Sequence, residues 1–304
     1  MSLLVVGNIA YDTIGDVCFL PRKDQATAVE NIMLSNGGCA GNVAVATSKL
    51  GIKSALYSAV GKDFKGSEYL KQLVQLGVNT SFLQYINGLT ARSFIFTDKK
   101  ERQQIYYYPG ASARLGEKKF SCEGFTHVHF TAGEISIYRR LMEKALKHGC
   151  CISFDPGQEM FHRPIREQIM SCLPFVSYLF FNEHEMKYLL ENTAIKDIKG
   201  LFSKKTRAIV VSKGEKGATL HRRNKSVEIP AVKVSHVKDP TGAGDAHRAG
   251  FLAGVIRGYD EEVACRIGAI VSSFVIQEKG TQTSLPSWQE MCRVYLKCFG
   301  EMKK

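Results

Sequence analysis

Short apolar runs alternate with segments of helical period along most of this 304-residue chain, and this alternation limits the possible folds more than any other feature. The runs are rich in β-branched and aromatic residues, as buried strands are. Strands separated by helices form parallel sheets with helices on their faces. The expected strands are 3–6, 54–60, 127–130, 151–154, 179–181 and 208–212. The sequence therefore predicts an α/β fold with a parallel sheet flanked by helices.

Two stretches of the chain break the alternation. Between the first strand and about residue 36, and again from 90 to 108, strand-like pieces follow one another without helices. Consecutive strands with short connections pair antiparallel. We expect a small antiparallel β appendage, inserted at about 12–36 and 90–110 into a single domain that spans residues 1–304.

The composition argues against several classes of protein. The 41 Lys and Arg outnumber the 29 Asp and Glu, but they are scattered and lack interleaved aromatic residues, so we expect solvated surface and no nucleic-acid partner. No apolar run reaches about 18 residues, and the first residues lack the pattern of a secretory signal. The nine cysteines contain no C-x-x-C pair and suggest reduced thiols without zinc. We expect a cytoplasmic protein with no membrane partner.

The stretch DPTGAGDAHRAGF, residues 239–251, has the composition of a phosphate-binding turn. Gly242, Ala243 and Gly244 offer consecutive backbone N–H groups with little side chain around them. At the start of a helix such groups form an anion hole for a phosphoryl group. Asp245 follows directly, and its carboxylate can accept the proton of an attacking hydroxyl. Small residues three and four apart continue the segment, which predicts a helix packed closely on its neighbour.

An alternative for Asp245 stays open from the residues alone. An Asp in the first turn of a helix is also an ordinary partner of the helix dipole. Neither a G-x-x-x-x-G-K-[ST] loop nor a G-x-G-x-x-G after the first strand occurs, so a phosphate site here is of another type.

Four ordered motifs resemble those of the ribokinase-like (PfkB) family of carbohydrate and nucleoside kinases. DPTGAGDxxxAGF is similar to the family's C-terminal signature. GGCAGNVA, which begins at Gly37 and Gly38 and contains Asn42, resembles the N-terminal glycine motif. NEHE, from Asn182 to Glu185, matches N-x-x-E, and SKGEKG, residues 212–217, matches the nucleotide loop. The resemblance covers residues 3–286 and implies a Rossmann-type sheet with a β lid.

The resemblance also implies a role for each matching position. Asp245 becomes the base that activates the acceptor hydroxyl, with Gly242, Ala243 and Gly244 as the anion hole. The remaining expected site residues are Asp12, Gly37, Gly38 and Asn42 for the acceptor, Ser212, Lys213, Gly214 and Gly217 for ATP, Asn182 and Glu185 for Mg²⁺ through water, and Asp239, Thr241, Gly280 and Ser284 for K⁺. Glu278 and His247 depart from the family pattern, since a basic residue is frequent at the first position and Phe is usual at the second.

The substrate class rests on two local stretches. YPGA, residues 108–111, and DPGQ, residues 155–158, resemble segments of prokaryotic and archaeal adenosine kinases. Phe94, Phe96 and three tyrosines in the lid offer stacking surface for a flat base; alternatively, they pack the lid against itself or a second subunit. We expect a nucleoside kinase, with adenosine ahead. A ribokinase-type sugar kinase and a non-catalytic ligand-binding member of the fold are the alternatives, and a homodimer through the lid is a further expectation.

Overall fold

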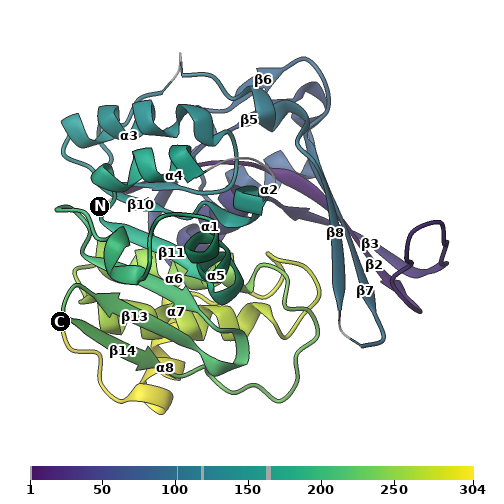
Figure 1. The fold of residues 1–304 in the computed structure, drawn as a ribbon. Helices are drawn as coiled ribbons and strands as arrows, with labels where there is room; N and C mark the ends of the chain where they lie inside the picture. The colour runs from purple at the N-terminus through teal and green to yellow at the C-terminus, as the bar shows by residue number, and fades with distance from the viewer. Residues whose placement is uncertain (1, 101, 118–119, 162–165) are drawn as a thin grey trace.

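The computed structural model describes residues 2–100, 102–117, 120–161 and 166–304, and it contains a large central sheet and a projecting smaller one (Figure 1). The strand order in the central sheet is β14-β13-β12-β11-β10-β9-β1-β4. All neighbours from β4 to β12 are parallel, whereas β13 and β14 add an antiparallel hairpin at one edge. The strands are β1 (Ser2–Val6), β4 (Lys53–Tyr57), β9 (His127–Phe130), β10 (Cys151–Phe154), β11 (Tyr178–Asn182), β12 (Ala208–Ser212), β13 (Ala218–Arg222) and β14 (Lys225–Ile229). The predicted α/β class is confirmed.

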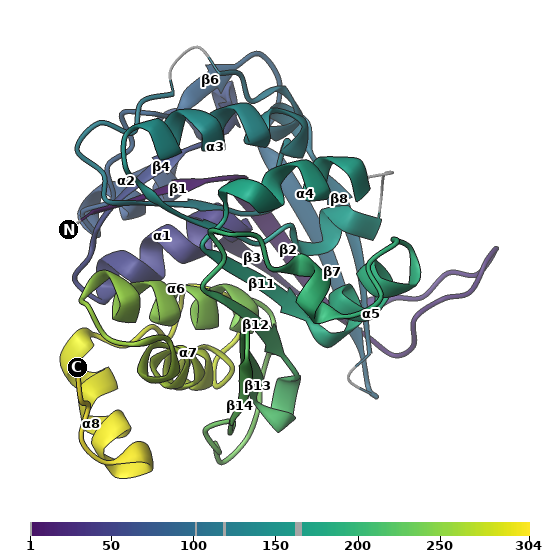
Figure 2. The same ribbon diagram turned by 60° about the vertical axis from the view of Figure 1, so that its left-hand side comes forward.

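Helices cover both faces of the central sheet (Figure 2). Alternate residues of β1 show why: Leu3 and Val5 enter one buried cluster, while Leu4 and Val6 enter the other. The first cluster packs on α1 (Cys39–Lys49), α2 (Glu68–Gln75), α6 (Ala243–Ile256), α7 (Glu261–Val275) and α8 (Trp288–Phe299). The second packs on α3 (Tyr138–Lys147), α4 (Arg166–Cys172) and α5 (Glu183–Glu191).

Short pieces of regular structure connect these layers. A two-stranded parallel ribbon pairs β5 (Ala59–Gly61) with β6 (Gln84–Ile86), so the predicted strand 54–60 is interrupted at Ser58. The short 3₁₀ helices are η1 (Lys62–Phe64), η2 (Gly110–Arg114), η3 (Ile135–Ile137), η4 (Gly157–Phe161), η5 (Leu173–Phe175), η6 (Ile198–Leu201) and η7 (Gly214–Lys216).

The second sheet, which we call the lid, has the order β3-β2-β7-β8 and extends away from the body. Its strands are β2 (Ala10–Val17), β3 (Val29–Gly37), β7 (Ala91–Asp98) and β8 (Gln103–Tyr108). The outer pairs β2–β3 and β7–β8 are antiparallel hairpins, as predicted. The central pair β2–β7 is parallel, because the two hairpins are joined through the body of the molecule.

The predicted close packing of the glycine-rich helix is confirmed by the contact between α6 and α7. A Cβ added to Gly250 would lie 2.8 Å from the Cα of Gly268, and one added to Gly254 would lie 2.8 Å from the Cα of Ala264. The small residues therefore let the two helix backbones touch. All nine cysteines are free thiols. Within the described ranges, every helix is too short or too polar to cross a bilayer.

Candidate active site

The predicted anion-hole turn forms the start of α6. Gly242 is the N-cap and has φ of 77°, a left-handed conformation that favours glycine. A Cβ there would also lie 2.7 Å from the Cβ of Thr281. The first turn of a helix has N–H groups without intrahelical acceptors, so this end attracts anions. The N–H of Ala243 donates to the carbonyl of Pro240 at 3.2 Å, so Gly242 and Gly244 are the better placed donors.

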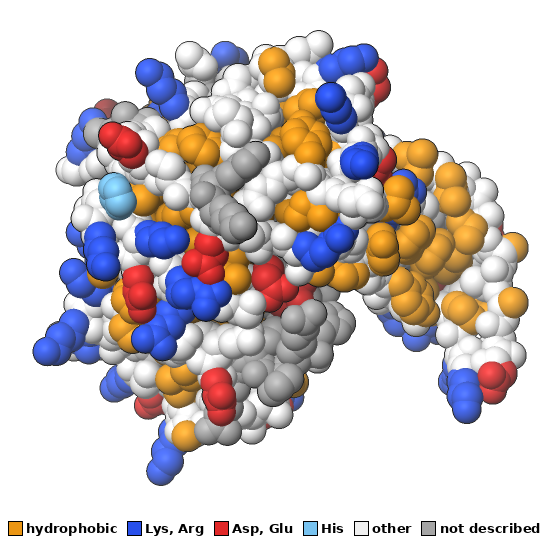
Figure 3. Space-filling model, turned by 90° about the horizontal axis from the view of Figure 1, so that it is seen from above, with side chains coloured by type: hydrophobic (Ala, Val, Ile, Leu, Met, Phe, Trp, Pro, Cys, Tyr) orange, Lys and Arg blue, Asp and Glu red, His pale blue; other side chains and the backbone are white. Residues whose placement is uncertain are grey.

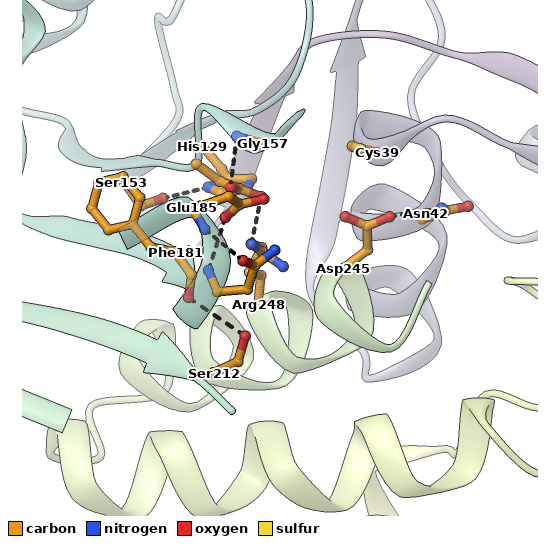
Figure 4. A network of polar contacts seen from close by, with 12 residues as sticks. Cys39, Asn42, His129, Ser153, Gly157, Phe181, Glu185, Ser212, Asp245 and Arg248 are labelled. Atoms are coloured by element: carbon orange, nitrogen blue, oxygen red, sulfur yellow. Dashed lines mark hydrogen bonds and ion pairs between the residues drawn. The ribbon is translucent and has the colours of Figure 1, made fainter. Parts of the chain in front are cut away.

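Asp245 lies in this first turn and is buried, with 8% of its surface exposed. Asn42 Nδ2 donates to Asp245 Oδ2 at 2.8 Å, across 203 residues of sequence. The Oδ1 of Asn42 accepts from Thr281 Oγ1 at 2.8 Å and from Gln282 Nε2 at 2.9 Å. The glycine motif of α1 and the signature of α6 therefore meet, and the Asn42 amide is oriented by its partners toward the carboxylate (Figure 4).

Asp12 of β2 lies beside the first glycine of the other motif. A Cβ added to Gly37 would lie 1.9 Å from Asp12 Oδ2, so only glycine fits there. Gly38 has φ of 83° and caps α1. The Oδ1 of Asp12 is buried without a hydrogen-bond partner among the described residues. A buried, unpaired carboxylate oxygen is costly, and a ligand hydroxyl would satisfy it.

Both carboxylates have altered acidity. Burial, together with the nearby charges of Asp245 and Asp239, raises the pKa of Asp12 to about 7, and a hydrogen bond from Ser93 opposes the rise. Burial raises the pKa of Asp245 to about 6, while Arg248 and the Asn42 hydrogen bond oppose the rise. Two groups that titrate near neutral pH in one place are typical of an active site.

Asn182 and Glu185 form the start of α5 directly after β11. Asn182 Oδ1 accepts from the Glu185 N–H, and Glu185 Oε2 accepts from the Asn182 N–H, both at 2.8 Å. This reciprocal pair is a capping box. Burial and the charge of Asp155 raise the pKa of Glu185 to about 7. Since each side chain already has a backbone partner, the pair suits a cation held through water better than one bound directly.

The predicted nucleotide loop joins β12 to β13. Lys213 N–H donates to the Gly217 carbonyl at 2.7 Å, which closes the loop around η7. Gly214 and Gly217 have φ of 58° and 88°. A Cβ at Gly217 would lie 2.0 Å from the carbonyl oxygen of Ile229, so this position accepts only glycine. Ser212 Oγ donates weakly to the Phe181 carbonyl at 3.4 Å, which links the loop to the N-x-x-E strand.

The proposed cation loop is tied together by Asp239. Its Oδ1 accepts from the Thr241 N–H at 2.9 Å, and its Oδ2 accepts from the Gly280 N–H at 3.2 Å. Ser284 lies four residues further on, half-buried. Glu278, the departure from the family pattern, is exposed and pairs with Lys238 at 2.7 Å.

His247 fills space within the helix layer. It is buried, and its Nε2 lies 3.8 Å from the Sγ of Cys265 on α7. Burial lowers the pKa of His247 to about 4, with Arg248 adding to the effect. The ring is therefore neutral near pH 7, which agrees with packing rather than proton transfer.

Three further residues of the site were missed from the sequence. Arg248 forms a buried ion pair with Asp155. Arg248 also lies near Asp245 (Figure 4). Two features of the sequence could have indicated this pair. Arg248 is a charged residue in a helix of mostly small and apolar residues, and Asp155 is an acidic residue directly after a buried strand. Asn8, directly beyond β1, accepts from the Cys39 N–H and donates to Tyr107 Oη, both at 2.9 Å.

The lid has two different faces, because alternate residues of a strand point to opposite sides. Asp12 pairs in register with Ser93, and Ser93 pairs with Tyr107, so these three share one side, the inner face. Contacts with the body mark this side: Gln103 Nε2 lies 3.4 Å from Thr241 Oγ1, and Lys279 Nζ lies 2.7 Å from Asp16 Oδ2. The inner face includes Asp12, Ile14, Asp16, Met33, Ser35, Ser93, Ile95, Gln103, Ile105 and Tyr107.

The opposite side, the outer face, carries most of the lid's aromatic rings. Phe94 pairs with Thr13 and Tyr106, one position away from the Asp12 row. The outer face includes Ile32, Leu34, Phe94, Phe96, Tyr106 and Tyr108. The expectation that Phe94 and Phe96 stack on a substrate base is therefore wrong, since they point away from Asp12. The alternative, that these rings pack against another surface, fits the register.

The comparisons with known proteins agree on one family. The model of the pfkB family carbohydrate kinases matches residues 1–288. A nucleoside kinase of Methanocaldococcus jannaschii is 36% identical over 293 residues, with 95% of each chain covered. A crystal structure of the nucleoside kinase of that organism has a TM-score of 0.88 at 34% identity, covering 98% of this chain and 99% of that one. The Burkholderia thailandensis nucleoside kinase in complex with inosine has a TM-score of 0.90 at 26% identity, with both chains fully covered.

Proposed function

The chain belongs to the pfkB family of carbohydrate kinases, and on that basis we propose that it is a nucleoside kinase that transfers the γ-phosphoryl group of ATP to the ribose 5′-hydroxyl. One observation carries the proposal. Two buried carboxylates, Asp12 from the lid and Asp245 from α6, lie at the junction of lid and body, and the charge of Asp245 helps to raise the pKa of Asp12. One suits an acceptor's hydroxyls, and the other suits proton abstraction.

In this mechanism, Asp12 accepts hydrogen bonds from ribose hydroxyls through its unpaired Oδ1. Asp245, held by Asn42, accepts the proton of the attacking 5′-hydroxyl. The N–H groups of Gly242 and Gly244 at the positive end of α6 stabilise charge on the transferred phosphoryl group. Ser212, Lys213, Gly214 and Gly217 lie in the loop that we assign to ATP. Lid closure excludes water, which would otherwise compete as acceptor.

Mg²⁺ fits best near Asn182 and Glu185, held through water as their hydrogen bonding suggests. When bound, the ion neutralises phosphate charge during transfer. For K⁺ we propose the loop of Asp239, Thr241, Gly280 and Ser284, in which Asp239 supplies a buried carboxylate. Replacing K⁺ by Na⁺ in the assay tests this assignment. The nine free thiols support a reducing compartment such as the cytoplasm.

A second copy of the chain is the partner that we propose for the outer face of the lid. Ile32, Leu34 and Tyr106 are 65%, 78% and 53% exposed there. Figure 3 shows apolar side chains gathered on the projecting sheet. Exposed apolar patches of this kind are typical of interfaces, and two lids pairing by these faces would bury them.

Adenosine is the acceptor that we expect to be preferred. The argument that the lid contacts the base of a nucleoside now rests on residues of the inner face. Ile14 and Ile95 are buried on that face, and Tyr107 is held by Asn8 and Ser112. The test is ADP release from Mg-ATP with adenosine, guanosine, inosine, cytidine, ribose, fructose and fructose 6-phosphate. A nucleoside with the highest kcat/KM supports the proposal. Turnover of free sugars alone would instead support a ribokinase-type enzyme, and no turnover would favour a non-catalytic role.

A further inference from the structure

Arg248 is a buried charge in α6, whose other residues, apart from Asp245 and His247, are small or apolar. It is 8% exposed, and its Nε forms an ion pair with Oδ2 of Asp155, which is 2% exposed. Asp155 follows β10 directly and also accepts from the Gly157 N–H at 3.1 Å. Figure 4 shows Arg248 between Asp245 and Glu185 at the start of α5. The ion pair thus connects the central sheet to the helix that carries Asp245.

The guanidinium of Arg248 also lies against the anion-hole turn. A Cβ added to Gly244 would lie 2.3 Å from Arg248 Nη1, so the two groups are in direct contact. Asp245 precedes Arg248 by three residues, about one helical turn. A fixed positive charge therefore lies directly beside both the proposed phosphate donors and the proposed base.

Stability alone does not account for this pair. Two charges taken out of water pay a desolvation penalty that their mutual attraction often fails to repay, and apolar replacements of buried pairs are frequently as stable. Apart from Asp245 and His247, the rest of α6 is built from small and apolar residues. A buried ion pair at this position thus calls for a reason beyond packing.

We propose that the Asp155–Arg248 ion pair is a positioning device for phosphoryl transfer: it fixes the anion-hole turn and sets the electrostatic environment of Asp245. Neither residue is a catalytic residue in this assignment, because each acts through Gly244 and Asp245. The inference rests on the proposed role of Asp245 as base.

The two members of the pair affect Asp245 in opposite directions. Arg248 lowers the pKa of Asp245, whereas Asp155 raises it. The other charged or titratable groups around Asp245 are Cys39 on α1, Tyr69 on α2, Asp12 on β2 and Glu185 on α5. Asp155 raises and Arg248 lowers the pKa of Glu185 and of Cys39 as well, so opposed shifts in the pH dependence of the two single variants still report on the pair.

The experiment compares Arg248→Gln, Asp155→Asn and the double variant with wild type in kcat, KM and the pH profile of kcat. We expect kcat to fall about 10- to 100-fold, because small displacements of reacting groups are costly, with KM for nucleoside and ATP changed much less. The acid limb of the pH profile, in which kcat falls as pH decreases, should move to higher pH in Arg248→Gln and to lower pH in Asp155→Asn. A merely structural pair would give no such opposed shifts.

Two further variants complete the design. Arg266→Gln breaks an arginine–glutamate pair on α7 that is partly exposed to solvent, and should leave kcat and its pH profile unchanged. Should the single variants fail to fold, the double variant, which leaves no buried charge unpaired, carries the test. The opposed shifts in pH profile offset each other in the double variant, so its kcat is the decisive value: a double variant with wild-type kcat overturns the inference.

Asp245→Asn separates this inference from the proposed function. If that variant retains near-normal turnover, the proposed role of the base is wrong, and the inference is overturned with it. If Asp245→Asn is inactive while the pair variants keep wild-type kcat and acid limb, the inference alone fails.

Discussion

The two faces of the lid are made by the same four strands, yet they differ in what covers them. On the inner face Ile14 and Ile95 are 5% and 3% exposed, and Asp12 meets the glycine motif of the body. On the outer face Ile32 and Leu34 are mostly exposed. A strand with one apolar face normally presents its polar face to water. The inner face combines apolar and polar residues and lies against the body, whereas the apolar residues of the outer face are exposed. We therefore assign the body with the substrate to the inner face and a second copy to the outer face.

The comparison also separates functions. Changes on the inner side, including the body residues that face it, should alter catalysis or substrate binding. Changes on the outer side should alter association and leave the chemistry intact. Each of the following predictions would break or sharpen that separation.

The largest effect should come from Asp245→Asn, in the body opposite the inner face. Loss of the general base should lower kcat by about 10²-fold or more, since positioned bases contribute that much. Binding of nucleoside and ATP should change little, because the amide keeps the size of the carboxylate. Steady-state kinetics with adenosine, together with calorimetric titration of both substrates, measures the two effects.

The stability of the same variant provides the control. The folded-state pKa of Asp245, about 6, lies above the ordinary value of 3.8, so wild type loses stability as pH rises between these values. Asp245→Asn lacks that loss and should have a higher free energy of unfolding at pH 7, by roughly 2–3 kcal/mol. Denaturant unfolding at pH 4 and pH 7 tests the sign. A variant that is less stable at pH 7 would mean that its loss of activity reflects damage to the fold.

On the inner face, Asp12→Asn should raise KM for the nucleoside by about 10- to 100-fold, because a hydrogen bond to a charged group contributes about 1.5–3 kcal/mol. KM for ATP should stay near the wild-type value. Asp16→Asn is the matched control, since Asp16 lies on the same strand and face but pairs with Lys279 at the surface. Equal effects of the two substitutions would contradict a specific role for Asp12.

Much of this arrangement could be predicted from the sequence. The alternation of apolar runs and helical segments predicted the central parallel sheet. The pfkB membership inferred from four motifs is confirmed. Gly37 and Gly217 could be identified in the glycine motifs, and the structure shows at each position atoms with which a Cβ would clash. These features are local, so their residues lie close together in the chain.

The rest depends on contacts between distant segments. The Arg248–Asp155 pair joins residues 93 positions apart, and nothing in either motif indicates the partner. The two faces of the lid depend on register: Phe94 and Asp12 differ by one position in the pairing of β2 and β7. Composition shows that the lid is aromatic, but only the register shows which rings face the substrate.

The pH dependence of catalysis should reflect both Asp12 on the inner face of the lid and Asp245 in the body that faces it. Asp12 and Asp245 must be ionised to act, and their pKa values are about 7 and about 6. The value of kcat/KM for the nucleoside should therefore be constant above about pH 8 and fall as pH decreases through 7 and then through 6. Asp12→Asn should remove the upper part of this limb. A profile that is flat down to pH 5 would contradict the raised pKa values and weaken the assignment of both residues.

The smallest kinetic effect should come from the outer face. Leu34→Lys places a charge where a second copy would pack, and we expect it to shift a dimer toward monomer by at least tenfold in Kd, measured by light scattering after size exclusion. Its kcat should remain within about twofold of wild type, because Leu34 points away from Asp12. Val74→Lys and Leu296→Lys, at exposed apolar positions on the body, are controls that should leave association unchanged. If Leu34→Lys instead abolished turnover while association persisted, the outer face would belong to the active site, and the division of the lid into two functions would be wrong.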